Sequence, residues 1–193
     1  MKVWHINSSG RHEQSHSKRI TQQFVDSLAS KKNIETTSLD VGAGLPFLNE
    51  TMIQSYFTPS EDRTAEQKSA IEVSNSIVTS AKAADTWVIG VPIYNFSMPA
   101  SFKAFIDLLC RSKETFTYTE TGPVGLLENK QVFVVVTSGG TEIGSEVDFL
   151  TPWLKHCFSF IGIQDVHFIH ADKYSPEKDA AIQQQVEQMT SSL

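Results

Sequence analysis

The chain has 193 residues, of which 40% are hydrophobic and 20% charged, and its formal net charge is −6. This length suits one domain with a sizeable core, and the composition excludes a largely disordered chain. Its 16 Lys and Arg residues are scattered along the sequence, which argues against nucleic acid as a partner because phosphates require a basic face.

Strands and helices alternate from the start of the chain. The segment KVWHI at residues 2–6 predicts a short buried strand. A helix follows, because Ile20, Phe24 and Leu28 recur at every fourth position. A second strand is predicted at residues 34–39.

The middle of the chain contains one unusual segment. Residues 41–66 are too long for an ordinary connection and predict either a functional lid or an insertion with short helices. A helix over 65–83 and a strand over 86–91 come next. The helix predicted over 99–111 has Pro99 in its first turn, where a missing N–H costs nothing.

The last third of the chain continues the alternation. Residues 116–125 predict a short hairpin, and residues 130–137 predict a strand buried on both faces. A helix is predicted to begin with Thr151 as its cap and Pro152 in its first turn. The remaining predicted elements are a strand at 166–170 and a helix at 176–189.

Five predicted strands alternating with helices are typical of a doubly wound α/β sheet, here as one domain over residues 1–193. Ligands of such sheets bind outside the carboxyl ends of the strands, at the switch point. The loops after the first, third and fourth predicted strands are the unusual ones: NSSGRHEQS, PIYNFSMP and SGGTEIG. We therefore expect these three loops to form a ligand site.

The first loop is rich in serine, with Ser9, Ser15 and Ser17 around His16. It contains neither a dinucleotide fingerprint nor a Walker sequence. Hydroxyl and N–H groups at a helix N-terminus can nevertheless hold a phosphate without Arg or Lys. The alternative is that Ser15 or Ser17 only caps the helix.

The second loop is stiff and aromatic, with a proline on each side. We expect the N–H groups of Tyr94, Asn95 and Phe96 to meet the edge of a flat heterocycle, and the Asn95 amide suits imide-like groups because it both donates and accepts. The alternative places Tyr94 and Phe96 in the core. In the third loop, Gly139 and Gly140 allow the backbone to approach a ligand, although any tight turn also uses such a pair.

Other chemistries find little support. Ser9 lacks the G-x-S-x-G context and triad partners of a hydrolase nucleophile. His167 and His170 lie three apart on a predicted strand and point to opposite faces, so no metal site is expected. Cys110 and Cys157 lie amid apolar residues of predicted helices and are expected to be reduced core thiols, with a disulfide or catalytic thiol as the alternative.

No apolar run approaches the roughly 20 residues needed to span a bilayer. The N-terminus MKVWHINSS lacks the apolar stretch of a secretory signal. We therefore expect no membrane partner and a cytoplasmic location.

One long run, PIYNFSMPASFKAFIDLLCRSKETFTYTETGPVGLLENKQVFVVVTSGG, resembles the FMN-dependent NAD(P)H azoreductase/quinone reductase family. The likeness continues in TPWLKHCFSFIGIQDVHFIHAD and in the serine-rich loop, and weakens only over residues 41–66. It implies a flavodoxin-like fold: a five-stranded parallel sheet in the order 2-1-3-4-5 with helices on both faces. Residues 41–66 would then be a long loop or insertion near the active site.

The resemblance implies bound FMN and a site with two departures from the family: His16, where many relatives have Gln or another residue, and Ser138, where some relatives carry Arg. The implied FMN-binding residues are Ser9, Ser15, His16, Ser17, Pro92, Ile93, Tyr94, Asn95, Phe96, Thr137, Ser138, Gly139 and Gly140. The chemistry would belong to the flavin, with no catalytic side chain and no metal.

The resemblance further implies ping-pong, two-electron reduction of quinone, azo or nitroaromatic acceptors by NADH or NADPH. It implies a homodimer with active sites at the interface and a substrate pocket shaped by Tyr118, Phe96 and Phe57. Two alternatives stay open. One is a flavodoxin-type electron-transfer protein that acts on a protein partner, and the other is a flavin-free α/β interaction domain.

Overall fold

A computed structural model describes the backbone of residues 1–193 and every side chain except that of Pro176. Its centre is a parallel five-stranded sheet in the order β2-β1-β3-β6-β7. The strands are β1 (Lys2–Asn7), β2 (Glu35–Asp40), β3 (Thr86–Pro92), β6 (Gln131–Ser138) and β7 (Asp165–Asp172). The five strands lie where the sequence predicts them, with ends shifted by about two residues at most.

The central position of β3 follows from its sequence, TWVIGVP, in which every residue is buried. Strand β2, ETTSLD, is mostly exposed and lies at one edge. A further pair, β4 (Phe116–Thr119) and β5 (Gly122–Gly125), forms a separate antiparallel hairpin, as predicted for residues 116–125. Because this hairpin takes two strand numbers, β6 and β7 occupy the fourth and fifth places of the predicted order.

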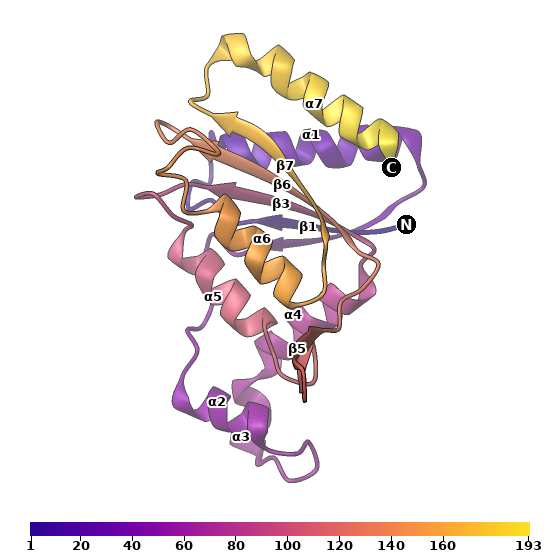
Figure 1. Cartoon of the computed structure of the whole chain (residues 1–193), viewed down its shortest axis with the longest axis vertical. Coiled ribbons are helices and arrows are strands. Elements are labelled where there is room, and N and C mark those ends of the chain that lie inside the picture. Colours follow the sequence, from indigo (N-terminus) through magenta and orange to yellow (C-terminus); the bar gives the residue numbers. More distant parts are fainter.

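Helices cover both faces of the sheet (Figure 1). Helices α1 (His16–Lys31) and α7 (Asp179–Ser192) cover one face, and α4 (Glu72–Ala83), α5 (Ala100–Leu109) and α6 (Thr151–Phe160) cover the other. Each face has its own core, because successive strand residues point to opposite sides. Val3 packs with Phe24 on the first face, and Trp4 packs edge-on against Trp87, 5.0 Å between ring centroids, on the second.

Helix α1 is fixed on the sheet by the predicted stripe. Ile20, Phe24 and Leu28 are fully buried. Ser15 is the N-cap and its side chain accepts a hydrogen bond from the Lys18 N–H. The start of α1 is thereby held at the carboxyl ends of the strands.

Residues 41–66 contain a short helix, α2 (Glu50–Phe57), as one of the two readings predicts, and Asn49 caps it. The predicted continuous helix over 65–83 is wrong. A capping box at Thr64 starts α3 (Ala65–Ala70), but the chain leaves helical geometry at Ile71, with φ −101° and ψ 8°, before α4 begins. Burial of the Ile71 side chain in the core accompanies this break.

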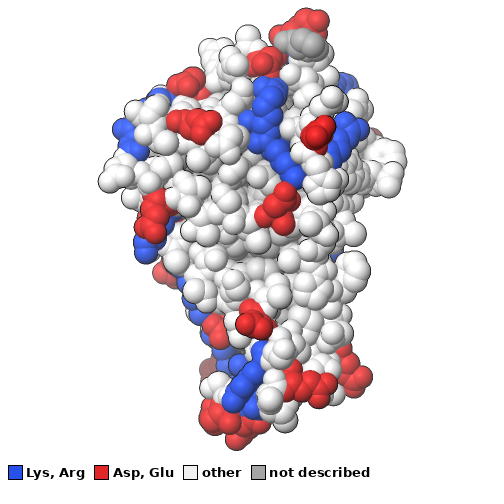
Figure 2. Space-filling model, turned by 180° about the vertical axis from the view of Figure 1, so that it is seen from behind, with Lys and Arg blue, Asp and Glu red and all other residues white. Residues whose placement is uncertain are grey.

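Helices α2 and α3 and the hairpin β4–β5 form a projection at the lower end of the molecule in Figure 1, which we call the lower projection. It lies apart from the loops that follow the carboxyl ends of the strands. Charges of both signs are interspersed on the face drawn in Figure 2, with a broad uncharged area between them. Over the described residues, no helix is long and apolar enough to cross a membrane.

Several expected helix ends are corrected. Pro99 is the N-cap of α5 instead of a first-turn residue, because its ψ of 144° is extended. Thr151 and Pro152 are the first two residues of α6, and Asp148 satisfies the N–H groups of Leu150 and Thr151 in place of a Thr151 cap. A short 3-10 helix at Pro176–Lys178 precedes α7, which therefore begins at Asp179.

The two cysteines are free, as expected, but neither is fully buried. Cys110 follows the end of α5 instead of lying on it, and Cys157 lies on α6. Both pack against the edge of the core. Burial raises the pKa of the Cys110 thiol to about 12 and that of the Cys157 thiol to about 11, so neither thiol has the thiolate character that a nucleophile requires.

Candidate functional site

The carboxyl ends of β1, β3 and β6 reach the same edge of the sheet (Figure 1). The loops that follow them line two adjoining clefts. The main cleft, ≈ 320 Å³, is lined by Ser9, Arg11, Ser15, His16, Ser17, Pro92, Ile93, Tyr94, Thr137, Ser138, Gly139 and Tyr174. The side cleft, ≈ 310 Å³, is lined by Ile93, Asn95, Phe96, Ser138, Gly139, Gly140 and Thr141. Each FMN-binding residue that the resemblance implies therefore lines one cleft or the other.

At the first loop, the serines have different roles. The Ser8 hydroxyl donates to the Gly90 carbonyl at 2.7 Å and holds the loop to β3. Ser9 is only 2% exposed, and its hydroxyl accepts from the Arg11 N–H at 3.2 Å. Ser15 caps α1, as one reading predicts, and its hydroxyl also lies 3.2 Å from that of Ser17 at the cleft. Capping and ligand binding are compatible here.

The sequence predicted that the first loop could hold a phosphate without any Arg or Lys. The structure adds a basic side chain, because Arg11 lines the main cleft. Its guanidinium adds a full charge to the partial positive charge of the α1 N-terminus. The sequence contained the signal, since Arg11 stands two residues after Ser9 in the same loop.

The second loop is a tight two-residue turn. Tyr94 and Ser97 exchange backbone hydrogen bonds of 2.8 and 3.1 Å. The expectation that the Tyr94 N–H meets a ligand is therefore wrong, because this N–H already donates to the Ser97 carbonyl. Asn95 and Phe96 both have positive φ, 49° and 67°, as in a type I′ turn. Their N–H groups make no hydrogen bond among the described residues.

The aromatic side chains of this loop are not core residues. Tyr94 is 38% exposed and Phe96 is 58% exposed. Asn tolerates the left-handed region, but a bulky residue such as Phe rarely occupies it, so the turn stores of order 1–3 kcal/mol of strain at this position. Strain of this kind clusters at ligand sites, which favours the ligand-loop interpretation.

The third loop leaves open space beside its glycines. A Cβ atom added at Gly139 or Gly140 would meet nothing within 4 Å. Beyond them, Asp148 accepts hydrogen bonds from the N–H groups of Gly144 at 2.8 Å and Thr151 at 3.0 Å. Burial would raise the pKa of the Asp148 carboxyl, but the hydrogen bonds from Thr151, Gly144 and Leu150 outweigh burial and lower it.

Besides Arg11, two residues lining the clefts were not anticipated, Tyr174 and Thr141. Tyr174 follows β7, and its ring stacks on that of His16 with 3.9 Å between centroids. The loop after the last strand begins at this edge of the sheet, because β7 is parallel to β6, and that position was the available signal. Partial burial and the cations Arg19 and Arg11 lower the pKa of His16, which is therefore neutral near pH 7.

The donors of the two clefts fit FMN. Hydroxyls, Arg11 and the α1 N-terminus at one end suit a phosphate monoester. Unpaired N–H groups of Asn95 and Phe96 at the other end suit the polar edge of a flat ring. Pro92, Ile93 and Tyr94 line the main cleft, and Ile93 lines both clefts.

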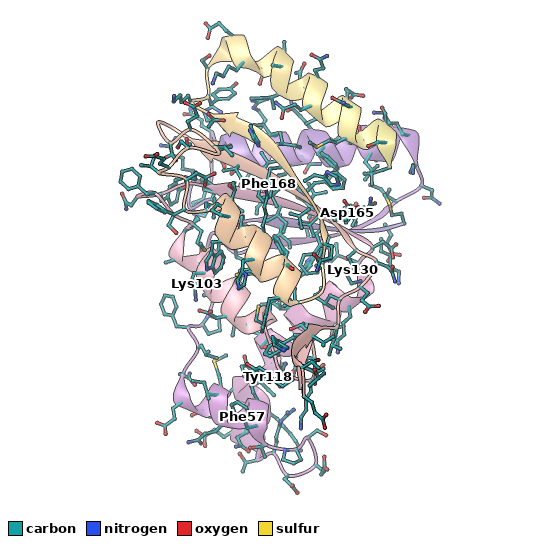
Figure 3. The ribbon with its side chains drawn as sticks, in the orientation of Figure 1. Phe57, Lys103, Tyr118, Lys130, Asp165 and Phe168 are labelled. Atoms are coloured by element: carbon teal, nitrogen blue, oxygen red, sulfur yellow. The ribbon has the colours of Figure 1, made fainter. Side chains whose placement is uncertain are left out.

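Two of the three expected substrate-pocket residues lie elsewhere. Phe96 lines the side cleft. Phe57 and Tyr118 line neither cleft and stand on the lower projection, 78% and 70% exposed (Figure 3). One copy of the chain does not bring these two side chains to its own clefts.

Comparisons with known proteins agree with this geometry. A protein family with a flavodoxin-like fold matches residues 1–193. The FMN-dependent NADH:quinone oxidoreductase 1 of Hahella chejuensis is 44% identical over 189 residues, 96% of this chain and 93% of that protein. The protein of the same name from Jannaschia sp. is 46% identical over 179 residues, 93% of this chain and 92% of that protein.

Solved structures lead to the same family. The FMN-dependent NADH-azoreductase from Bacillus anthracis, in complex with FMN, is 26% identical and matches with a TM-score of 0.88 over 99% of this chain and 98% of that chain. The azoreductase AzrA matches with a TM-score of 0.89 at 25% identity, over the full length of both chains. The chain therefore belongs to the FMN-dependent NADH:quinone oxidoreductase and azoreductase family, which has a flavodoxin-like fold.

Proposed function

We propose that the protein is an FMN-dependent oxidoreductase that uses NADH or NADPH for ping-pong, two-electron reduction of quinones and azo compounds. One observation supports the proposal most strongly. The loops line one cleft with hydroxyl groups and Arg11, which suit an anion, and the adjoining cleft with Asn95 and Phe96, whose N–H groups make no hydrogen bond among the described residues. The names of the relatives support it and favour NADH as the reductant. Nitroaromatic acceptors belong to the same proposal because they too are flat and accept electrons.

The main cleft would bind the phosphate end of FMN. Ser9, Ser15 and Ser17 would donate hydroxyl hydrogen bonds, and Arg11 would pair with the phosphate charge. The resemblance adds His16 to this group. Because Ser9 is held by the Arg11 N–H and α1 is fixed by its buried stripe, little reorganisation is needed on binding.

The other end would bind the ring. Pro92, Ile93 and Tyr94 would form its wall, with Thr137 and Ser138 beside it, and Gly139 and Gly140 would leave room for its pyrimidine edge. When bound, FMN supplies the chemistry, accepting a hydride from the nicotinamide and passing two electrons to the acceptor. The Asn95 amide and the N–H groups of Asn95 and Phe96 would stabilise the negative charge that develops at that edge.

We also propose a single FMN-binding domain over residues 1–193 that acts as a homodimer. Phe57 and Tyr118 are exposed on the lower projection, away from the clefts of their own chain. A second copy could use them to complete its substrate pocket, with residues 41–66 at the interface. A cytoplasmic location stays a prediction.

Anaerobic mixing tests the proposed function. The protein is supplemented with FMN, and NADH or NADPH is added without oxygen. We expect the visible flavin absorbance to disappear and to return when a quinone or an azo dye is added. Initial rates at several concentrations of both substrates should give parallel double-reciprocal lines.

Two outcomes would contradict the proposal. A protein that gains no flavin band with added FMN would be the flavin-free interaction domain. A protein that binds FMN but keeps its absorbance with both nucleotides would be the flavodoxin-type electron-transfer protein, which receives its electrons from another protein.

A further inference from the structure

The stacked rings of His16 and Tyr174 stand between two cavities. One is the main cleft. The other, which we call the outer groove, has a volume of ≈ 350 Å³ and lies at the start of α1. The outer groove is lined by His12, Gln14, Ser15, His16, Lys18, Arg19 and Tyr174. Ser15, His16 and Tyr174 line both cavities, so the stacked pair is a wall common to the two.

This wall is anchored to two helices. The Arg19 guanidinium on α1 donates to the Tyr174 hydroxyl at 3.0 Å, and that hydroxyl donates to the Asp179 carboxylate on α7 at 3.2 Å. Arg19 and Asp179 also form a 2.7 Å ion pair. The Tyr174 ring packs beside the core between α1 and the sheet. Displacing the ring would break the stack on His16 and both hydrogen bonds.

The outer groove contains cations that would suit a phosphate. Lys18 and Arg19 line it, but each is already paired, with Asp40 and Asp179, at 2.7 Å. A second phosphate leaving the main cleft at the start of α1 would meet the wall first. Beyond the wall it would have to compete with these carboxylates.

FAD is FMN extended at its phosphate by adenosine monophosphate. With its ring at Asn95 and its first phosphate at Ser15 and Ser17, an extension that runs along the start of α1 into the outer groove meets the space that the stacked pair occupies, because both rings line the main cleft and the outer groove. We infer that the His16–Tyr174 pair is a specificity determinant that restricts the flavin ligand to the mononucleotide. This inference rests on the proposed function, because it requires the main cleft to hold the flavin phosphate. It acts by a steric barrier against the competitor.

Binding of FMN and FAD to flavin-free full-length protein tests the inference. The two dissociation constants are measured by quenching of flavin fluorescence. We expect the wild type to bind FMN more tightly than FAD. In Tyr174→Ala, the ratio of the FAD constant to the FMN constant should fall by about tenfold or more, because the wall is removed.

Two further variants separate the wall from neighbouring effects. Tyr174→Phe keeps the ring and loses only the hydroxyl contacts, so it should keep the wild-type ratio. His12→Ala changes a histidine that lines the outer groove alone, and it should also keep that ratio. If Tyr174→Ala does not fold, His16→Ala removes the other ring, which is exposed, and should lower the ratio in the same way.

The outcomes are distinct. Equal binding of FMN and FAD by the wild type would overturn the inference. So would a folded Tyr174→Ala protein with an unchanged ratio. A wild type that binds neither flavin would instead overturn the proposed function.

Discussion

Arg111 lies over the ring of Tyr56, with its Cζ 4.6 Å from the ring centroid. Its Nη1 donates to the Asn75 side-chain oxygen at 2.6 Å and to the Ser74 hydroxyl at 3.3 Å. Its backbone N–H donates to the Thr115 hydroxyl at 2.9 Å, just before β4. The buried side chain thus joins α2 to α4, the backbone of the same residue contacts the segment before the hairpin, and together they secure the lower projection to the rest of the molecule.

Replacing Arg111 should therefore destabilise the protein. Arg111→Met keeps most of the volume but removes the charged donor and the contact with Tyr56, and we expect it to lower the free energy of unfolding by about 2–3 kcal/mol. Arg111→Lys should recover only part of the loss, because an ammonium lacks the planar fork. Urea unfolding measures both. Lys113→Met, on the exposed turn nearby, is the control and should change little; an Arg111→Met protein as stable as this control would contradict the assignment.

Asn95 combines a backbone role and a side-chain role that two substitutions can separate. Its φ is 49°, which Gly adopts freely and Ala does not. We expect Asn95→Ala to lower the free energy of unfolding by about 1 kcal/mol and Asn95→Gly to leave it near the wild-type value. Both should weaken FMN binding by about tenfold, because both remove the amide. FMN titration of an Asn95→Gly protein that matches the wild type would show that the amide does not contact the flavin.

Local patterns predicted those features that depend on neighbouring residues. The stripe of Ile20, Phe24 and Leu28 predicted α1, and the apolar run WVIGV predicted the strand at 86–91 that the structure shows as β3. The loops of the site were found because parallel strands bring their carboxyl ends to one edge. That rule depends only on strand order, so the site loops were predicted correctly although the ends of several helices were not.

Tertiary contacts decided what local patterns missed. The break at Ile71 reflects burial of that side chain against other elements, which helical periodicity does not show. The Tyr94 N–H is taken by Ser97 because Asn95 and Phe96 turn the chain back on itself. Tyr174 reaches the cleft from a segment about 160 residues beyond His16. No pattern within one segment of the sequence predicts that the His16 and Tyr174 rings are in contact.

Gly42 has no side chain, and this allows the backbone of the serine loop to approach it closely at Ser9. A Cβ atom at this position would lie 2.1 Å from the Ser9 backbone oxygen, a severe clash with backbone that cannot move aside cheaply. Gly42→Ala should displace the loop and weaken FMN binding by tenfold or more, about 1.4 kcal/mol. Gly10→Ala, in the same loop and with nothing within 4 Å of its Cβ, is the matched control. Equal FMN affinities of the two variants would refute a role for the Gly42–Ser9 approach.

Asp148 should make the third loop sensitive to acid. The folded state lowers the pKa of this carboxyl, so its stabilising effect is present above the unfolded pKa of about 3.9 and is lost as the pH falls through the lower folded pKa. At pH 7, Asp148→Asn should cost about 1–3 kcal/mol, because the amide nitrogen replaces one of the two carboxylate oxygens and leaves either the Gly144 N–H or the N–H groups of Leu150 and Thr151 facing a donor. Unfolding at pH 7 and pH 3 should show the wild-type advantage shrinking at the lower pH. An advantage of the same size at both would contradict this account.

His5 should make the whole fold weaker below neutral pH. The ring is buried on β1, with its Nε2 2.8 Å from the Thr21 hydroxyl and 3.3 Å from the Asn7 amide nitrogen. Burial lowers its pKa, and the carboxylates of Asp26 and Asp40 only partly oppose that effect.

The direction of this pH dependence follows from proton uptake by the unfolded chain. Below about pH 6.5 the unfolded chain binds a proton at His5 that the folded protein does not, so stability is complete above that pH and falls as the pH decreases toward the lower folded pKa. One such proton contributes at most about 1.4 kcal/mol per pH unit. Urea unfolding at pH 7.5 and 5.5 should therefore show a smaller loss for His5→Gln than for the wild type. His12→Gln, whose side chain is exposed, should keep the wild-type loss, and a His5→Gln protein that does the same would show that this histidine does not set the pH dependence.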